Sequence, residues 1–331
     1  MHLIRRLVAL ALYIAVLLSM FWACAALWID GPTSRPLSGF LAVGYAAVTV
    51  LILLRCQPIT RSVTLYLAPF AAVLWWWLSI APSNDRDWQA EVARLASARI
   101  EGDMVTIENV RDFDYSSETD ITERWETRSY KLSEIKGVDL FKSHWGSPLI
   151  AHTFISWEFE QGPPLTISIE TRKEVGEVYS AVRGFFRQFE LYYVVSSEAD
   201  LAKVRTNVRG ETVYLYRLRG TPEEARALLL DYLKTVNELR EKPAWYNALE
   251  YNCTTSIRQH IQAIVPVPFD WRILVNGYLD EAAYEHGNIN TSIPFDELRE
   301  ASRINERANA DGTESYSVRI RTGLPARPGV D

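Results

Sequence analysis

One cysteine lies beyond the first 60 residues of the 331-residue chain. It is Cys253, in the stretch YNCTTSIRQHI, where Asn252 or Thr254 can cap a helix that begins at this point. Backbone N–H groups and the helix dipole stabilise a thiolate in the first turn of a helix. The stretch therefore predicts a reactive thiol. A buried inert thiol and an intermolecular disulfide are the alternatives.

Helical spacing predicts where this sulfur points. Cys253, Ile257, Ile261 and Ile264 recur on one stripe of the expected helix. An apolar stripe of this kind packs on a sheet, so we expect the sulfur to face the sheet at the helix end. A base carried by a strand could meet it there.

Histidine is the base expected beside a thiol nucleophile. His260 shares the helix with Cys253, but seven residues correspond to about 10 Å along the axis, too far for contact. His144 and His286 are predicted to lie in loops. His152 interrupts a strand and is therefore the candidate base.

A predicted hairpin provides a partner for this histidine. The runs LIAHTFISWEF (149–159) and LTISIETR (165–172) alternate apolar and polar residues around EQGPP. Matching their apolar faces fixes the register parity and places His152 on the polar face that Glu170 and Arg172 share. Glu170 could orient the imidazole and stabilise its cation. The alternative is that Glu170 and Arg172 pair with each other.

Three apolar runs near the start are long enough to span a membrane, roughly Leu7 to Trp28, Leu37 to Leu54 and Val63 to Ile80. The first also resembles a signal peptide. Its apolar core exceeds the usual 7–15 residues and two further runs follow, so we expect an uncleaved span. Burial of all three runs in a soluble core is disfavoured because few charges interrupt them.

The distribution of arginines predicts the orientation of these spans. Arg5 and Arg6 precede the first span, and Arg55 and Arg61 lie between the second and third. The positive-inside rule puts these ends and the N-terminus in the cytoplasm, and the chain after the third span outside it. Cys24 and Cys56 then cannot reach Cys253.

The chain is therefore expected to have three parts. Residues 1–82 form a three-helix transmembrane anchor, 83–307 an extracytoplasmic Cys/His thiol-enzyme domain, and 308–331 a disordered tail. The short linker SNDRDW keeps the domain near the bilayer. Its order of strands, helix, strands and helices predicts an α+β fold.

Composition and motifs exclude several functions. A net charge of −6 with 23% charged residues argues against a nucleic-acid partner. The extracytoplasmic part has no H-E-x-x-H or C-x-x-C motif, so no metal site is expected. No glycine-rich phosphate loop follows a strand, and we expect no cofactor.

Three stretches, SHWGSPLIAHTFISWEF, SIETRKE and YNALEYNCTT, together resemble the Lnb N-terminal periplasmic domain family over roughly Arg86 to Ala308. The resemblance implies a circularly permuted NlpC/papain-like fold, in which the histidine strand precedes the cysteine helix. It also implies Cys253 as nucleophile, His152 as base and Glu170 as orienting residue. An N-C pair at a helix start is similar to the lecithin:retinol acyltransferase group.

The name-giving enzymes of this family are lipoprotein N-acyltransferases, whose membrane helices follow the domain, whereas here three spans precede it. We therefore expect a membrane-anchored thiol acyltransferase of the bacterial inner membrane with a periplasmic catalytic domain. It would take an acyl group from a membrane lipid and pass it to an amine or hydroxyl acceptor, such as a lipoprotein N-terminus. Backbone N–H groups at the helix start would hold the oxyanion.

Three further residues are expected to bind at this site: Asn252, Thr254 and Arg172. Two other functions are compatible with the same residues. One is a cysteine peptidase or amidase acting on peptide or amide bonds of the cell envelope. The other is a non-catalytic, membrane-anchored binding module.

Overall fold

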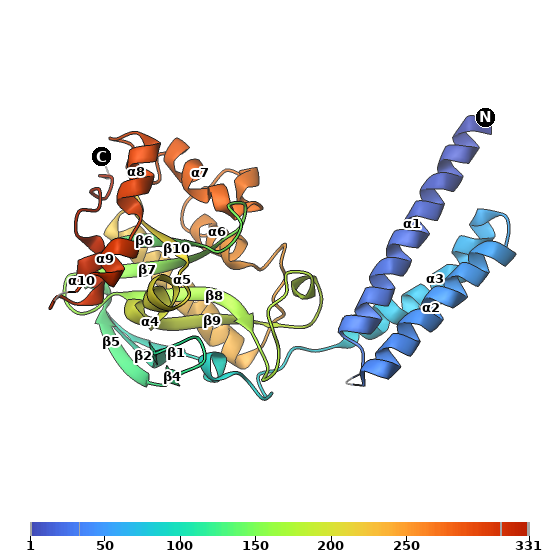
Figure 1. The fold of residues 1–331 in the computed structure, drawn as a ribbon, viewed down its shortest axis with the longest axis horizontal. Helices are drawn as coiled ribbons and strands as arrows, with labels where there is room; N and C mark the ends of the chain where they lie inside the picture. Colours follow the sequence, from blue (N-terminus) through green and yellow to red (C-terminus); the bar gives the residue numbers. More distant parts are fainter. Residues whose placement is uncertain (1, 33, 312, 330–331) are drawn as a thin grey trace. The chain divides into compact units, whose positions relative to one another are not determined.

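The computed structural model describes residues 2–32, 34–311 and 313–329 (Figure 1). The chain divides into two compact units. The first unit holds the N-terminal residues up to Ser83 together with residues 179–189, and the second holds residues 84–178 and the chain from Glu190 onward.

Three helices make up most of the first unit: α1 (His2–Ile29), α2 (Arg35–Arg55) and α3 (Ile59–Ser79). Each is long and apolar enough to cross a membrane, and each contains one of the three predicted runs. The chain is thus a membrane protein with three N-terminal apolar helices.

A loop over residues 179–189 also belongs to the first unit. The sequence EVYSAVRGFFRQ (177–188) predicts a helix, but this prediction is wrong, since the only regular element there is the 3₁₀ turn η3 (Arg183–Phe185). Arg187 accounts for much of the difference. Its guanidinium lies 4.5 Å from the centre of the Trp77 ring, and its backbone N–H donates to Asp30 at 3.1 Å. These contacts hold the segment in an irregular conformation.

An eight-stranded, mostly antiparallel sheet forms the centre of the second unit. Seven strands run in the order β1-β2-β9-β8-β7-β6-β10, and β5 pairs with β2. Their bounds are β1 Ser97–Glu101, β2 Met104–Arg111, β5 Trp125–Lys131, β6 Ile135–His144, β7 Ala151–Phe159, β8 Leu165–Arg172, β9 Glu190–Ser197 and β10 Thr212–Arg217. A separate two-stranded sheet contains β3 (Asp114–Tyr115) and β4 (Ile121–Thr122).

Helices cover both faces of the large sheet. On one face lie α5 (Pro222–Glu241) and α6 (Cys253–Gln262); Trp157 of β7 donates to the Ala225 carbonyl of α5 at 2.9 Å. The other face carries α4 (Glu198–Lys203), the π-helix η4 (Val204–Val208), α9 (Asn305–Asn309) and α10 (Tyr316–Arg321). Phe154 of β7 packs there with Leu201 and Ile304. The second unit is therefore a mixed α/β domain, in agreement with the α+β prediction.

Helix α5 begins where its capping signal predicts. Thr221 is the N-cap and accepts from the N–H of Glu224, whose side chain accepts from the N–H of Thr221. The remaining short elements are η1 (Ala90–Val92), η2 (Leu132–Glu134), η5 (Trp271–Ile273), η6 (Asn276–Tyr278), α7 (Leu279–Glu285) and α8 (Phe295–Ser302).

The structure differs from the disordered tail predicted over 308–331. Helix α10 lies in this region, and its Ile320 is fully buried. Arg321 bonds to two buried carboxylates, Asp139 at 2.8 Å and Glu198 at 2.6 Å. The polar composition of the tail suggested disorder, but its arginine neutralises charges that the sheet and α4 bury.

We expect the substitution Arg321→Met to lower the midpoint of thermal unfolding by roughly 10 °C, because it leaves two buried carboxylates short of a counter-charge at a cost of about 3–5 kcal/mol. Circular dichroism of the full chain in detergent measures the shift. Lys234→Ala is the control, since its pair with Glu238 is exposed and contributes little. Equal midpoints for the two variants would contradict the packing of α10.

Candidate active site

The candidate thiol stands at the first residue of α6. Asn252 is the N-cap, and its side-chain oxygen accepts from the N–H groups of Thr254 at 3.0 Å and Thr255 at 2.9 Å. Cys253 is 8% exposed and not in a disulfide. The N–H of Cys253 has no acceptor within the described chain, whereas those of Thr254 and Thr255 are bonded to Asn252, so it is the backbone donor left available for the predicted oxyanion role.

The sulfur lies where two strands of the sheet separate. β7 and β8 pair from Trp157/Leu165 only as far as Phe154/Ser168, although β7 continues to pair with β6 and β8 with β9. Thr153 of β7 lies beyond the last pair. Its backbone does not pair with β8 and lies close enough to Cys253 to lower the pKa of the thiol.

His152 reaches the thiol from the opposite face of the sheet. Thr153 contacts Thr254 of α6 at 3.2 Å, so α6 covers the Thr153 face. Strand alternation then turns His152 to the other face, where its ring lies 5.9 Å from that of Phe154. His152 is nevertheless close enough to Cys253, at the separated strand ends, for each group to shift the pKa of the other.

Ser168 links His152 to Glu170. The Nε2 atom of His152 lies 2.8 Å from the Ser168 hydroxyl, which donates to Oε1 of Glu170 at 2.8 Å. The direct distance from Nε2 to Oε1 is longer, 3.4 Å. The predicted histidine–carboxylate pair is thus present, with a serine hydroxyl inserted between the two groups.

This chain of hydrogen bonds selects one tautomer of the imidazole. The hydroxyl hydrogen of Ser168 points at Glu170, so the Ser168 oxygen accepts from Nε2–H of His152. With Nε2 protonated, Nδ1 is the nitrogen free to take a proton from Cys253. Nδ1 is therefore the nitrogen available for the predicted base role.

Arg205 of η4 supports the carboxylate. Its guanidinium donates to Glu170 at 3.3 Å and to Glu211 at 3.1 Å, and only 6% of the residue is exposed. A π-helical turn is uncommon and is often found at functional sites. Here it carries the cation that fixes Glu170.

The pKa shifts follow from these contacts. Burial raises the pKa of Cys253, but the charge and hydrogen bond of His152 lower it more, to about 6. Burial and Arg205 lower the pKa of His152, whereas Cys253 and Glu170 raise it above its ordinary value. Burial raises the pKa of Glu170, yet His152, Arg205 and Arg111 bring it well below its usual range. Both the lowered pKa of Cys253 and the raised pKa of His152 favour the thiolate–imidazolium form of the pair.

Asn276 of η6 also reaches the thiol. Its side-chain nitrogen lies 3.9 Å from the sulfur of Cys253 and donates to the Thr254 hydroxyl at 2.9 Å. Its side-chain oxygen accepts from the N–H of Ala151 at 2.8 Å. An amide held in this way next to Sγ, together with the Cys253 N–H, can stabilise an oxyanion.

A tight turn holds Asn276 in place. A Cβ on Gly277 would lie 2.0 Å from the Pro148 carbonyl oxygen, so only glycine fits. Buried Lys142 donates to the Gly277 carbonyl at 2.9 Å and pairs with Asp280. The amide is therefore fixed by both the backbone and a buried ion pair.

The prediction that Arg172 binds at the site is wrong. Its guanidinium donates to the carbonyls of Val92 at 2.9 Å and Ala93 at 3.0 Å, and it lies 4.2 Å from the Trp88 ring centre. Arg172 follows Glu170 by two residues on the same strand face, about 7 Å further along β8. It anchors the start of the second unit. Nor does it pair with Glu170, whose cationic partner is Arg205.

The other histidines have structural surroundings. His260 bonds to Asp231 and to the Tyr193 hydroxyl, both at 2.7 Å, which occupies both ring nitrogens. His144 is the last residue of β6, not a loop residue as predicted. His286 follows α7 and bonds to the carbonyl of Ala282.

Sequence reasoning gave no role to Ser168, Arg205 or Asn276. Ser168 lies two residues before Glu170, so strand alternation puts its hydroxyl on the same face, and this was the available signal. The Asn276–Gly277 pair is a turn signal. Nothing in the sequence around Arg205 marks it. Within the described ranges, no group of three or more His, Cys, Asp or Glu side chains could hold a metal ion.

Comparison with known proteins gives one finding. Residues 121–277 match the family model described as the Lnb N-terminal periplasmic domain. The match includes Cys253, His152, Glu170 and Asn276. Neither the curated proteins nor the solved structures contain a match to the chain.

We expect His152→Ala to slow alkylation of Cys253 by iodoacetamide roughly thirtyfold at pH 7, since the pKa then rises from about 6 to at least the ordinary thiol value. The rate is measured against pH in a Cys24→Ser, Cys56→Ser background. Glu170→Gln should give a smaller rise in pKa. His286→Ala is the control, and an unchanged profile in His152→Ala would rule out the thiolate–imidazolium pair.

Proposed function

From the membership of residues 121–277 in the Lnb N-terminal periplasmic domain family, we propose that the chain is a membrane-anchored thiol acyltransferase. The observation that carries the proposal is the thiol of Cys253 at a helix start, in contact with an imidazole that Ser168 and Glu170 orient. The second unit is periplasmic. The orientation with the N-terminus in the cytoplasm, and the placement in the bacterial inner membrane, are part of the proposal.

The first half of the reaction forms a thioester. The thiolate of Cys253 attacks the carbonyl carbon of an acyl ester, and the negative oxygen is held by the Cys253 N–H and the Asn276 amide. The carbon–oxygen bond to the leaving alcohol then breaks as the imidazolium of His152 gives that oxygen its proton from Nδ1. The acyl group is now bonded to sulfur and His152 is neutral.

The second half transfers the acyl group. An amine or hydroxyl, such as a lipoprotein N-terminus, attacks the thioester carbonyl while Nδ1 of His152 takes its proton. The carbon–sulfur bond breaks and the thiolate–imidazolium pair returns. Only residues 80–83 connect α3 to the second unit, and this favours a membrane lipid as the acyl donor.

Incubation of the full chain in phospholipid vesicles should produce a fatty-acyl adduct on Cys253. Intact-mass analysis detects it, and neutral hydroxylamine removes it because it is a thioester. Cys253→Ala should carry no adduct, and Cys253→Ser should carry an oxyester that resists hydroxylamine. Release of cleaved envelope peptide with no adduct would favour the hydrolase, and absence of any turnover would favour the binding module.

Asn276→Ala should lower kcat for acyl transfer by about 10²- to 10³-fold, because one donor to the oxyanion is lost. The pKa of Cys253, measured by alkylation, should stay near 6, since His152 is the main cause of its shift. A change in the thiol pKa large enough to account for the loss of rate would contradict the oxyanion role. It would mean that Asn276 acts on the ionisation of the free thiol and not on the transition state.

A further inference from the structure

An apolar cavity of about 370 Å³ lies beside α6 in the second unit. This volume is within the range of small-molecule sites in proteins. Aliphatic side chains form most of its wall, including Leu140, Ile155, Ile257, Ile261, Val265 and Ala283. They come from β6, β7, α7 and α6 with the chain just after it.

The cavity runs along the helix stripe that begins at the thiol. Thr254, the neighbour of Cys253, is part of its wall, and so are Ile257 and Ile261, four and eight residues after Cys253. The sequence predicted that this stripe packs on the sheet. In the structure an open volume lies between part of the stripe and the sheet residues Leu140 and Ile155.

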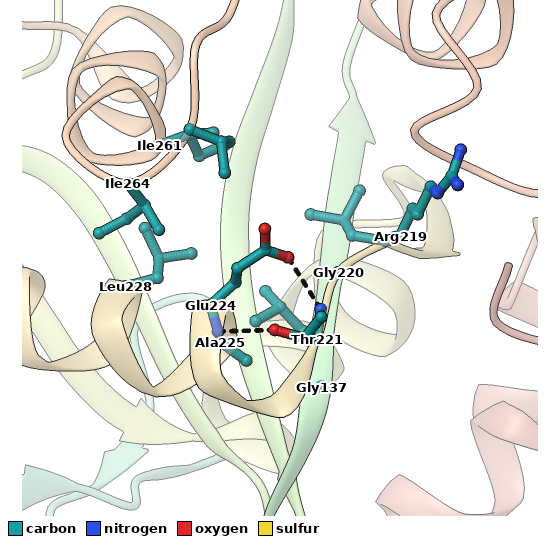
Figure 2. A pocket seen from close by; sticks show the side chains of 12 residues that line it. Gly137, Arg219, Gly220, Thr221, Glu224, Ala225, Leu228, Ile261 and Ile264 are labelled. Carbon is teal, nitrogen blue, oxygen red and sulfur yellow. Dashed lines mark hydrogen bonds between the residues drawn. The ribbon is translucent and has the colours of Figure 1, made fainter. Parts of the chain in front are cut away.

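A smaller cavity of about 90 Å³ lies between α5 and α6. Figure 2 shows Ile261 of α6, Ile264 just after this helix, and Leu228 of α5 around it. Leu218, Ile261 and Val265 belong to the walls of both cavities. Ile261 therefore stands where the larger cavity meets the smaller one.

The larger cavity has three charged side chains in its wall, Arg219, Arg258 and Asp270, and the last two are engaged with protein partners. Arg258 donates to Gln262 at 2.8 Å and to the Val267 carbonyl at 3.2 Å. Asp270 pairs with Arg272 at 2.7 Å. A wall formed mostly by aliphatic carbon, with Arg258 and Asp270 occupied, suits a hydrocarbon better than a peptide or a sugar.

We propose that this cavity holds the hydrocarbon chain of the acyl group carried by Cys253, and that Ile261 sets the chain length. The inference rests on the proposed thiol acyltransferase function. A chain attached at the sulfur enters beside Thr254, follows the stripe past Ile257 and ends against Ile261. Filling the cavity also removes the destabilisation that an empty apolar space of this size causes.

The test uses the full chain in lipid nanodiscs, with Cys24→Ser and Cys56→Ser as background, and p-nitrophenyl esters from acetyl to hexadecanoyl. Nitrophenolate release gives the rate, and intact mass gives the adduct on Cys253. Ala283→Phe fills the cavity and should slow the long esters roughly tenfold or more, since each methylene that cannot be buried costs about fourfold. Acetyl transfer should stay within about twofold of the unsubstituted rate.

Two further variants complete the design. Ile261→Ala opens the larger cavity toward the smaller one and should extend the range of esters accepted to longer chains. Ala263→Phe places the same ring on the exposed end of α6, outside both walls, and should leave the chain-length profile unchanged.

The outcomes separate the two proposals. Acylation of Cys253 with one chain-length profile for all variants would overturn the acyl-chain cavity and leave the thiol acyltransferase standing. Absence of a Cys253 adduct with every ester would overturn both. Opposite shifts of the chain-length profile, to shorter esters in Ala283→Phe and to longer esters in Ile261→Ala, would support the acyl-chain cavity. If Ala283→Phe fails to fold, the profile of Ile261→Ala alone decides.

Discussion

The early end of the β7–β8 ladder is the constraint on which the candidate site depends. Pairing stops at Phe154 and Ser168, while β6 and β9 continue to hold the outer edges of the two strands. The gap is therefore fixed by neighbours and not by flexible chain. Had the ladder continued, His152 would pair opposite Glu170, and the N–H of Thr153 would face a strand in place of sulfur. The gap lets a thiol on one face of the sheet meet an imidazole on the other.

Much of this arrangement follows from two periodicities in the sequence. Period-two alternation placed His152 and Glu170 on one strand face, and the N-C-T signal placed Cys253 at a helix start. Alternation could not go further, because both faces of the sheet are buried and the pattern does not say which helix covers which face. It also treated Arg172 like Glu170, although two residues further along the strand the neighbour is Trp88. The strand gap, and the approach of Asn276, depend on contacts between segments more than 20 residues apart.

The charges behind the histidine are costly to bury, and their arrangement accounts for why they are tolerated. Glu170, Arg205 and Glu211 form a chain in which the single arginine serves two carboxylates. Buried ion pairs of this kind contribute little net stability, since desolvation offsets their attraction. Their effect here is on protonation. They keep Glu170 ionised, and an ionised Glu170 keeps the hydroxyl hydrogen of Ser168 directed away from His152. The tautomer of His152 that leaves Nδ1 free for the thiol is thus set by Glu170, through Ser168.

In the proposed acyl transfer, helix α6 imposes two requirements on the substrate at the same time. Its first turn supplies the thiol and one oxyanion donor, which any acyl group could use. The stripe that continues from the thiol faces an aliphatic cavity, which only a hydrocarbon tail can fill with gain in free energy. Cys253 is only 8% exposed, so water has little access to a thioester formed there. An acceptor bound at the site then has the advantage over bulk water. Burial of the nucleophile and an apolar extension along the same helix thus both favour transfer over hydrolysis.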